Sequence, residues 1–430
     1  MSQKIPKQLE ALANWILLGK KVSSEEVRQR EVEAIAYLLC CEFEQKQIWI
    51  ALGFQRSKFH TRKKEAIKQE LYVPQRYRGK RESEIQRVIL EVDIQDSIRS
   101  ILRSDNPFCD VRVYPSSESD PSDSKNWDAA LVGFSKFAGA RLVELAGKST
   151  IFGCTWGRTV YSVAERFIDV WPCNSRRDTI VIPTWGEPLK KGEHNSDVYT
   201  KPISSTEIAV RMREVINRGQ PLPATPSLLG VPAIVPMTFS DDQTKTIKEL
   251  MLTADGYSAI FGKSTQTKGQ IDKMDGLLTA AGAPKPRERF WSEAVLKSGG
   301  FSTKERELLF EGVIGDIGGV LLPKLDASEE QLELLTKIQN RWLGISEKHI
   351  LECAKRGRIG GPPGVVLCAV GASRAETVFE CLIRKMANHL LIDFHLAQRL
   401  LTIIEERNGL HGGLGQDSAR QSSKANDLNS

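Results

Sequence analysis

The stretch TIFGCTWGRTVYSVAERF, residues 150–167, decides the fold of the larger part of this chain. Thr150 to Cys154 is an apolar run typical of a buried strand, and Arg158 to Phe167 has apolar residues at helical spacing. A turn with glycine and small polar residues joins them. A strand that leads directly into a helix is the repeating unit of a parallel sheet covered by helices. We therefore expect an α/β fold.

Further strand and helix patterns alternate on both sides of this unit. The expected strands are Asp110 to Tyr114, Thr179 to Thr184, Met274 to Ala280 and Gly364 to Val370, and the expected helices are Trp127 to Ala146, Thr206 to Asn217, Ala375 to Ala387 and Asp393 to Glu406. The 430 residues exceed the usual size of one domain. We expect an N-terminal module over residues 1–82, an α/β domain with a mostly parallel sheet over 83–407, and a disordered tail rich in Gly, Ser, Gln and Asn over 408–430.

The N-terminal module has the pattern of a helix-turn-helix. Short amphipathic helices are expected at Glu33 to Cys41 and at Glu44 to Leu52, and Gly53 ends the second. A longer basic helix follows from Gln55 to Leu71, and its inward residues are expected to be Phe59, Ala66, Ile67 and Leu71. A short helix, a turn with glycine and a longer basic helix together indicate a DNA-binding module.

Positive charge is concentrated in this module. Between Arg56 and Arg81 there are ten Lys and Arg and two Glu, a local net charge of +8, whereas the whole chain carries only +6. Such confinement is typical of contact with a phosphate backbone, although a solvated helix face is the alternative. The segment Val73 to Arg81 is interpreted either as a wing or arm that contacts DNA or as a plain interdomain linker.

Base contacts are expected from the first turns of the basic helix, because helices of this kind enter the major groove by that end. The candidate DNA-contacting residues are Gln55, Arg56, Ser57, Lys58, His60, Arg62 and Lys64. Arginine reads guanine through two hydrogen bonds. His60 is equally explained as a surface residue, and Arg62 and Lys63 stand at positions where such helices usually carry apolar residues.

The eight cysteines lie in apolar or mixed surroundings, with neither a CxxC pair nor histidine at metal-ligand spacing. We interpret them as buried thiols and predict neither a metal site nor a cofactor. The N-terminus lacks the pattern of a signal peptide, and the apolar runs are too short to span a bilayer. The sequence therefore predicts a cytoplasmic protein without a membrane segment.

Three glycine-containing segments are candidates for an anionic or sugar-like ligand. Gly153 to Thr159 joins a strand to a helix, where free backbone N–H groups suit a phosphate, and Arg158 adds charge. Gly312 to Gly319 contains a single acid, Asp316, which either binds sugar hydroxyls or caps a helix. Ala369 to Ala375 is a second strand-to-helix loop, and it places Arg374 to meet an anion.

From about Glu33 to Glu405 the sequence resembles the SorC family of sugar-binding transcription regulators, whose effector domain is related to sugar-phosphate isomerases and deaminases. The segments that carry this resemblance are Trp156 to Thr159, Pro183 to Gly186, Leu222 to Pro226, Gly315 to Ile317 and Leu391 to Asp393. Each segment is short, and the resemblance to the family depends on the order and spacing of the five segments. The loop at Ala280 to Gly282 and the residue Val370 depart from the family pattern, which points to an effector other than a simple sugar phosphate.

The resemblance implies an effector site built from Thr155, Trp156, Gly157, Arg158, Thr159, Asp316 and Arg374. It also implies a regulator whose affinity for double-stranded operator DNA depends on a bound sugar or sugar phosphate, and which assembles as a homodimer or homotetramer. The alternative is a sugar-phosphate isomerase or deaminase. Such an enzyme needs positioned acids and bases, and these loops offer one acid and no histidine, so we expect a protein that is not an enzyme.

Overall fold

The structure is a computed structural model that describes residues 24–40, 45–69, 72–73, 76–77, 93–100, 109–114, 127–172, 178–186, 204–217, 226–228, 230–264, 267–283, 295–296 and 299–407. The chain divides into two compact units, Met1–Ser97 and Ile98–Ser430. The domain boundary expected at 82/83, the tail over 408–430, residues 222–225 and residues 78–81 of the expected arm lie outside the described residues.

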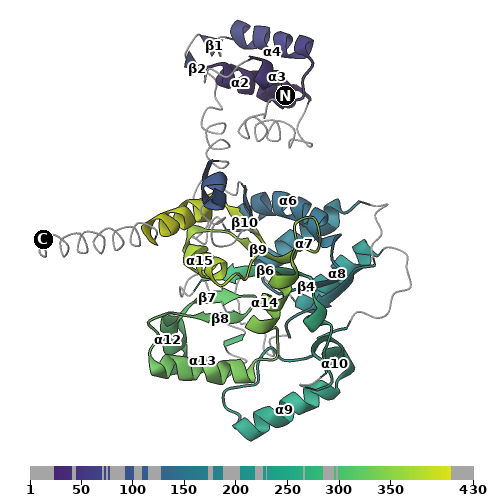
Figure 1. Cartoon of the computed structure of the whole chain (residues 1–430), viewed down its shortest axis with the longest axis vertical. Helices are drawn as coiled ribbons and strands as arrows, with labels where there is room; N and C mark the ends of the chain where they lie inside the picture. Colours follow the sequence, from purple (N-terminus) through teal and green to yellow (C-terminus); the bar gives the residue numbers. More distant parts are fainter. Residues whose placement is uncertain are drawn as a thin grey trace, which may run out of the picture. The chain divides into compact units, whose positions relative to one another are not determined.

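The residues that the structure describes between 24 and 77 of unit 1 form three helices and a short antiparallel hairpin (Figure 1). They are α2 (Ser24–Cys40), α3 (Gln45–Ala51), α4 (Arg56–Lys68), β1 (Tyr72–Val73) and β2 (Arg76–Tyr77). Gly53 adopts φ +63° between α3 and α4, a backbone conformation that favours glycine. The helix, turn and basic helix are therefore present as the sequence predicts, and the hairpin lies where a wing was one interpretation.

A small apolar core holds the three helices of unit 1 together. Its buried members are Ala34, Ile35, Leu38, Ile48, Leu52, Phe54 and Phe59. Phe59 and Ala66 of α4 face inward as expected, but Ile67 is 50% exposed and the helix ends at Lys68. The expected inward position of Ile67 is wrong because Phe59 and Ala66 lie seven residues apart on one face, and the neighbouring position turns outward.

Unit 2 is built on an eight-stranded sheet (Figure 1). Six strands run parallel in the order β3-β10-β9-β6-β4-β5. They are β3 (Asp110–Tyr114), β4 (Ile151–Cys154), β5 (Ile180–Pro183), β6 (Gly276–Gly282), β9 (Gly364–Ala369) and β10 (His389–Asp393). The antiparallel hairpin of β7 (Val313–Ile317) and β8 (Val320–Pro323) joins the end of β6. The predicted α/β class with a mostly parallel sheet is confirmed.

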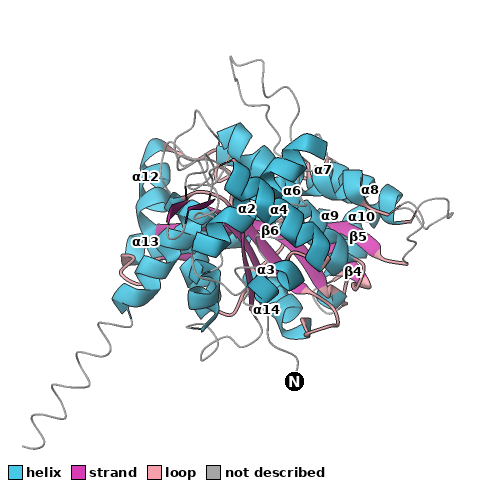
Figure 2. Ribbon diagram, turned by 90° about the horizontal axis from the view of Figure 1, so that it is seen from above, coloured by secondary structure: helices cyan, strands magenta, loops and turns pink. Residues whose placement is uncertain are grey.

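Helices enclose the strands, as Figure 2 shows. They are α6 (Trp127–Ala146), α7 (Arg158–Val170), α8 (Ser205–Ile216), α9 (Asp241–Thr253), α10 (Asp255–Phe261), α12 (Thr303–Gly312), α13 (Glu329–Arg341), α14 (Glu347–Arg356), α15 (Ala375–Ile383), the short 3-10 helices η1 (Ile271–Lys273) and η2 (Ala372–Arg374), and a helix over 394–407.

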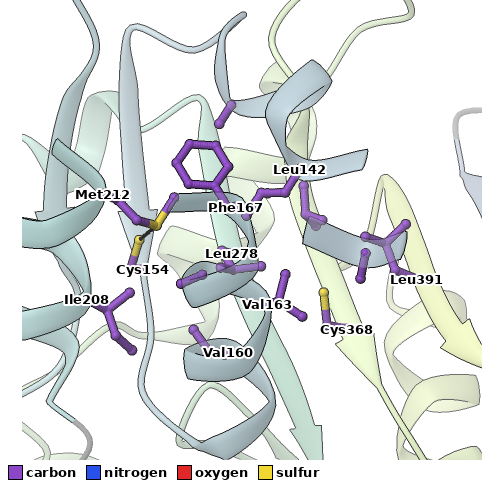
Figure 3. Close-up of a cluster of buried hydrophobic side chains, with 14 of the residues drawn as sticks. Leu142, Cys154, Val160, Val163, Phe167, Ile208, Met212, Leu278, Cys368 and Leu391 are labelled. Carbon is purple, nitrogen blue, oxygen red and sulfur yellow. Dashed lines mark hydrogen bonds between the residues drawn. The ribbon is translucent and has the colours of Figure 1, made fainter. Parts of the chain in front are cut away.

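The main core lies between the sheet and α6, α7 and α8. Figure 3 shows Phe167 of α7, Met212 of α8, Leu278 of β6 and Cys368 of β9 among the side chains of this core. A second core, around Trp185, Leu321 and Leu335, packs the β7–β8 hairpin against α12 and α13. The two cores meet at the carboxyl ends of β4 and β5, since Cys154 belongs to the first and Trp185 to the second.

Most predicted strands and helices of unit 2 match the structure within a few residues, and α6 matches at both ends. Three parts of unit 2 are not assigned from the sequence. They are the strand β10 and the regions 218–273 and 283–363, which contain α9, α10, α12, α13, α14 and the β7–β8 hairpin. Asp316 does not cap a helix, which is one of the two roles that the sequence allows for it. Asp316 lies on β7 opposite Gly282, because β7 pairs with the end of β6.

The described cysteines are Cys109, Cys154, Cys353, Cys368 and Cys381, and all five are free thiols. All but Cys109 are buried, which agrees with their interpretation as buried thiols. Loss of hydration raises the pKa of the half-buried Cys109 thiol to about 12, and burial raises the pKa of the other four thiols as well. Within the described ranges, no helix is both long and apolar enough to cross a membrane.

Candidate functional site

The outward face of α4 carries most of the residues predicted to contact DNA. The side chains of Gln55, Arg56, Ser57, Lys58, His60 and Lys64 are exposed, whereas Phe59 and Ala66 are buried on the opposite side. Gln55 precedes α4 in an extended conformation and makes no side-chain hydrogen bond to cap it. A phosphate oxygen can therefore reach the backbone N–H groups at the start of a helix whose first turn has no acidic residue.

Arg62 differs from the other predicted DNA contacts because it turns toward α2. Its Nε donates to Glu31 at 2.7 Å, and its side chain is only 17% exposed. Glu31 is itself buried and also accepts from Lys58 at 2.6 Å. Arg62 stands at a position where an apolar residue is more usual, and its ion pair with Glu31 joins α4 to α2.

Glu65 extends this network to the start of α2. It accepts hydrogen bonds from Arg62 at 3.2 Å and from Arg28 at 2.9 Å. The hydrogen bond from Arg28 lowers the pKa of the Glu65 carboxyl, and the charge of Arg62 adds to this effect. These pairs hold α4 on α2 and leave Arg56 and Lys64 on the solvent side.

In unit 2, the strand order reverses between β4 and β6. The chain passes from β4 to β5 at the edge and then returns to form β6 on the other side of β4. In open parallel sheets, such reversals leave a crevice beyond the carboxyl ends of the two strands, where ligands bind. The structure brings the predicted effector-site residues to this end of the sheet, since they follow β4 and β9 or face the end of β6.

The turn after β4 is built around Gly157, which adopts φ +117° with open space where a side chain would lie. Gly157 precedes α7, and no side chain caps this helix. Arg158 is exposed at the first position of α7, whereas Thr155 and Thr159 are buried. The Thr155 hydroxyl lies 3.4 Å from both the Leu278 carbonyl and the Thr279 hydroxyl, so it fastens the turn to β6.

Trp127, the first residue of α6, brings the two predicted arginines together. The guanidinium carbon of Arg374 lies 4.2 Å from the centroid of the Trp127 ring, and that of Arg158 lies 5.4 Å from it. Arg374 is buried and donates to the Val370 carbonyl at 2.8 Å. Two cations from two strand-end loops therefore gather on one aromatic ring, an arrangement suited to an anion.

Asp316 is buried on β7 beside these loops. Its Oδ2 accepts from the Gly319 backbone N–H at 2.7 Å, and its Oδ1 has no hydrogen-bond partner among the described residues. Burial raises the pKa of this carboxyl to about 7, although the Gly319 hydrogen bond and the charge of Arg374 act to lower it. A buried acceptor with one unused oxygen is suited to a ligand hydroxyl.

Trp156 packs against other aromatic rings. Its ring centroid lies 3.9 Å from that of Trp185, and Trp185 lies 5.2 Å from Trp342. The turn of the β7–β8 hairpin packs against the turn after β4, because a side chain at Gly318 would meet Thr155. These contacts fix the position of the turn after β4.

Two residues at this end of the sheet were missed from the sequence. Trp127 was counted only as the start of a helix, although an aromatic residue directly after a polar loop was a usable signal. Asp393 ends β10, and its Oδ1 accepts from the backbone N–H groups of Gly371 at 2.8 Å and Leu396 at 3.3 Å. It is thus a second buried acid here, and it holds the loop after β9 in place.

Within the part of the chain that the structure describes, no three His, Cys, Asp or Glu side chains are grouped so as to hold a metal ion.

Comparison with known proteins finds similar solved structures. The full-length sorbitol operon regulator SorC from Klebsiella pneumoniae is 16% identical, with a TM-score of 0.48, and the match covers 87% of this chain and 99% of that one. A DeoR family transcriptional regulator from Listeria monocytogenes is 16% identical, with a TM-score of 0.47 and coverage of 72% and 99%. A transcriptional regulator from Streptococcus pneumoniae is 15% identical, with a TM-score of 0.48 and coverage of 74% and 99%. Neither a protein-family model nor a curated protein matches the chain.

Proposed function

We propose that this chain is a DNA-binding transcription regulator, and that a sugar or sugar phosphate bound at the carboxyl end of the sheet in unit 2 controls its affinity for operator DNA. The observation that carries the proposal is the exposed basic face of α4, held on α2 by the Glu31 network. The printed names of the similar structures, transcriptional regulators among them, agree with it.

Unit 1 supports DNA binding through geometry and charge. α4 is 13 residues long and begins without a side-chain cap, and the chain from Arg56 to Arg81 carries a net charge of +8. Exposed Arg56 and Lys64 lie two turns apart on this helix, so they would meet different parts of a duplex. Half-buried Arg62, which turns toward α2, would contribute by positioning α4.

Unit 2 supports an anionic ligand. Arg158 and Arg374 flank Trp127, and the uncapped start of α7 lies beside Arg158. Asp316 would accept a ligand hydroxyl through its unused oxygen. Control of DNA affinity then requires that the ligand bind two conformations of the protein unequally, because equal binding shifts no equilibrium.

A mobility-shift assay tests DNA binding. Intact protein is incubated with genomic fragments of the source organism at low and at physiological salt, because phosphate contacts weaken steeply as salt rises. We expect a subset of fragments to be retained at both salt concentrations. Retention of none, even at low salt, would refute the DNA-binding part of the proposal.

A thermal-shift screen against sugars and sugar phosphates tests the ligand. A compound present at about a hundred times its dissociation constant stabilises a protein by roughly 2.7 kcal/mol, which a shift in Tm reports. The stabilising compound should then change retention of the bound DNA fragments. A compound that binds without changing DNA affinity would separate ligand binding from regulation.

The isomerase or deaminase alternative is tested with the same compounds. Asp393, the second acid at this end of the sheet, is engaged by two backbone N–H groups, which supports a structural role. We expect no turnover of the stabilising compound.

We also propose that the protein is a homodimer or homotetramer in the cytoplasm, since regulators of this kind bind two-fold sites. Light scattering of the intact chain measures its mass in solution.

A further inference from the structure

A cavity lies at the opposite end of the sheet from the candidate effector site. Its volume is about 410 Å³, and it is formed where β3, β10 and β9 begin, so it belongs to unit 2 alone. Asp110 is the first residue of β3 and His389 the first of β10. The proposed effector site does not use these residues.

The walls of this cavity are strongly basic. Five cationic side chains line it, Arg99, Arg112, Arg141, Lys148 and Arg358, and its one acidic lining residue is Asp110. Lys148 and Arg358 are exposed at the rim, and neither is paired with a carboxylate among the described residues. A cavity with this excess of positive charge attracts anions.

Asp110 organises the arginines without neutralising them. It pairs with Arg99 at 2.9 Å, Arg112 at 3.2 Å and Arg141 at 3.0 Å. Burial acts to raise the pKa of Asp110, but His389 and the arginines outweigh burial and lower it. One ionised carboxylate therefore fixes three guanidinium groups in place, and a net positive charge remains.

Unused hydrogen-bonding capacity remains beside the cavity. The buried Nε of Arg141 and Nδ1 of His389 have no hydrogen-bond partner among the described residues, and His389 Nδ1 is 3.7 Å from Asp110, too far for a good hydrogen bond. Arg141 is also paired with Glu144, which is mostly exposed. Unsatisfied buried polar atoms cost free energy unless a ligand or an ordered water completes them.

Helix ends explain only part of this cluster. Helices that cover a parallel sheet end near the start of its strands, and cations are favourable at those ends. Lys148 follows α6 and Arg358 follows α14, so both satisfy this account. It does not explain why a strand residue, Arg112, and two arginines from separate segments meet on one half-buried carboxylate.

We propose that this cavity is a second ligand site, which binds a phosphate group, either free or as part of a small molecule. The paired N–H groups of a guanidinium match the oxygens of phosphate, and Asp110 would position these groups before the ligand binds. The loop from Gly357 to Gly361 also lines the cavity. Gly360 adopts φ +78° with open space beside it, which lets the backbone approach a ligand closely.

Calorimetric titration of the intact chain with inorganic phosphate tests the site. The titration is made in an Arg158→Gln background, which weakens the candidate effector site at an exposed residue. The double variant Lys148→Gln/Arg358→Gln changes only exposed side chains and should fold normally. We expect it to raise the Kd for phosphate about tenfold or more, because each charged hydrogen bond lost is worth about a factor of ten.

A charge-matched control is Lys245→Gln/Lys268→Gln, whose two side chains are exposed elsewhere in unit 2. It should leave the Kd for phosphate unchanged. Equal affinity in the parent and the Lys148→Gln/Arg358→Gln protein would overturn the proposal, as would an equal loss in the control. Reduced retention of duplex DNA with unchanged phosphate affinity would assign this surface to DNA instead. None of these outcomes depends on the identity of the effector.

Discussion

The guanidinium of Arg374 lies over the ring of Trp127, 4.2 Å from its centroid. This contact joins the loop after β9 to the first residue of α6, two segments that are about 250 residues apart in the sequence. Trp127 also lies under Arg158 from the turn after β4. A ligand that moves either arginine would therefore act on α6 and on both strand-end loops.

Arg374→Met should abolish stabilisation by the effector and also lower the stability of unit 2. The charge is lost from the candidate site, and so are the hydrogen bond to Val370 and the contact with Trp127. Together these interactions are worth about 1–3 kcal/mol. Urea unfolding measures the stability, and calorimetric titration with the stabilising sugar derivative measures the affinity.

Arg399→Met is the control for Arg374→Met, because Arg399 is exposed and, among the described residues, its ion pair is a long one of 3.8 Å with Glu406. Its stability and ligand affinity should equal those of the parent. If Arg374→Met also left the ligand affinity unchanged, Arg374 would be a structural residue only. If Arg374→Met lowered stability without changing ligand affinity, the result would support the contact between Arg374 and Trp127 but not a role of Arg374 in ligand binding.

The stability of the protein should depend on pH through Asp316. Its pKa in the folded protein is about 7, above the ordinary aspartate value of 3.8, so the folded state binds the proton more tightly than the unfolded state does. The resulting stabilisation is fully present below about pH 4 and is lost as the pH rises through 7. Asp316→Asn removes this dependence and should become more stable relative to the parent by on the order of 1.4 kcal/mol per pH unit between pH 5 and 7.

Urea unfolding of the parent and of Asp316→Asn at pH 5, 6, 7 and 8 measures this difference. Asp326→Asn, at an exposed position on the turn after β8, is the matched control and should show a constant difference across the range. A constant difference for Asp316→Asn as well would mean that Asp316 is ionised throughout in the folded protein.

The sequence predicts well those segments whose pattern is local. α6 was placed at its observed ends, because polar loop residues precede Trp127 and an apolar pattern runs unbroken to Ala146. The turn at Gly157 was also recognised, since a glycine between a strand and a helix is informative by itself. Periodicity and turn chemistry are properties of neighbouring residues, so the sequence reports them directly.

The misassignments depend on contacts between distant segments. Asp316 lies on a strand because β7 pairs with the end of β6, and nothing in the residues around Asp316 reveals that partner. Likewise, Arg62 is turned inward by Glu31 of another helix, and Trp127 meets arginines from two other loops. Residue type alone therefore identified candidate charges, but tertiary contacts decide which of them remain accessible.

Arg62→Met should reduce DNA binding by destabilising unit 1. Removing Arg62 leaves Glu31 buried with Lys58 as its remaining partner. Losing one member of a fully buried ion pair costs about 3–5 kcal/mol of stability. The cost here is smaller, because the Arg62 side chain is 17% exposed. Hydrogen exchange or urea unfolding of the intact chain measures the loss. Adding Glu31→Leu should restore part of the stability, whereas no recovery would exclude the stranded charge as the cause.

Arg56→Ala and Lys64→Ala should change DNA binding in different ways without affecting stability. Both side chains are exposed and belong to α4, but Arg56 is its first residue and Lys64 lies two turns later. At the start of a recognition helix an arginine meets base edges, so its loss should cost about 1–3 kcal/mol on the preferred site and relax the sequence preference. A lysine farther along meets phosphate, so its loss should weaken binding to all DNA sequences about equally and reduce the salt dependence of binding.

Mobility-shift titrations of both variants against a randomised set of operator fragments compare their sequence preferences. Identical profiles would show that the first turn of α4 is not the part that reads the bases.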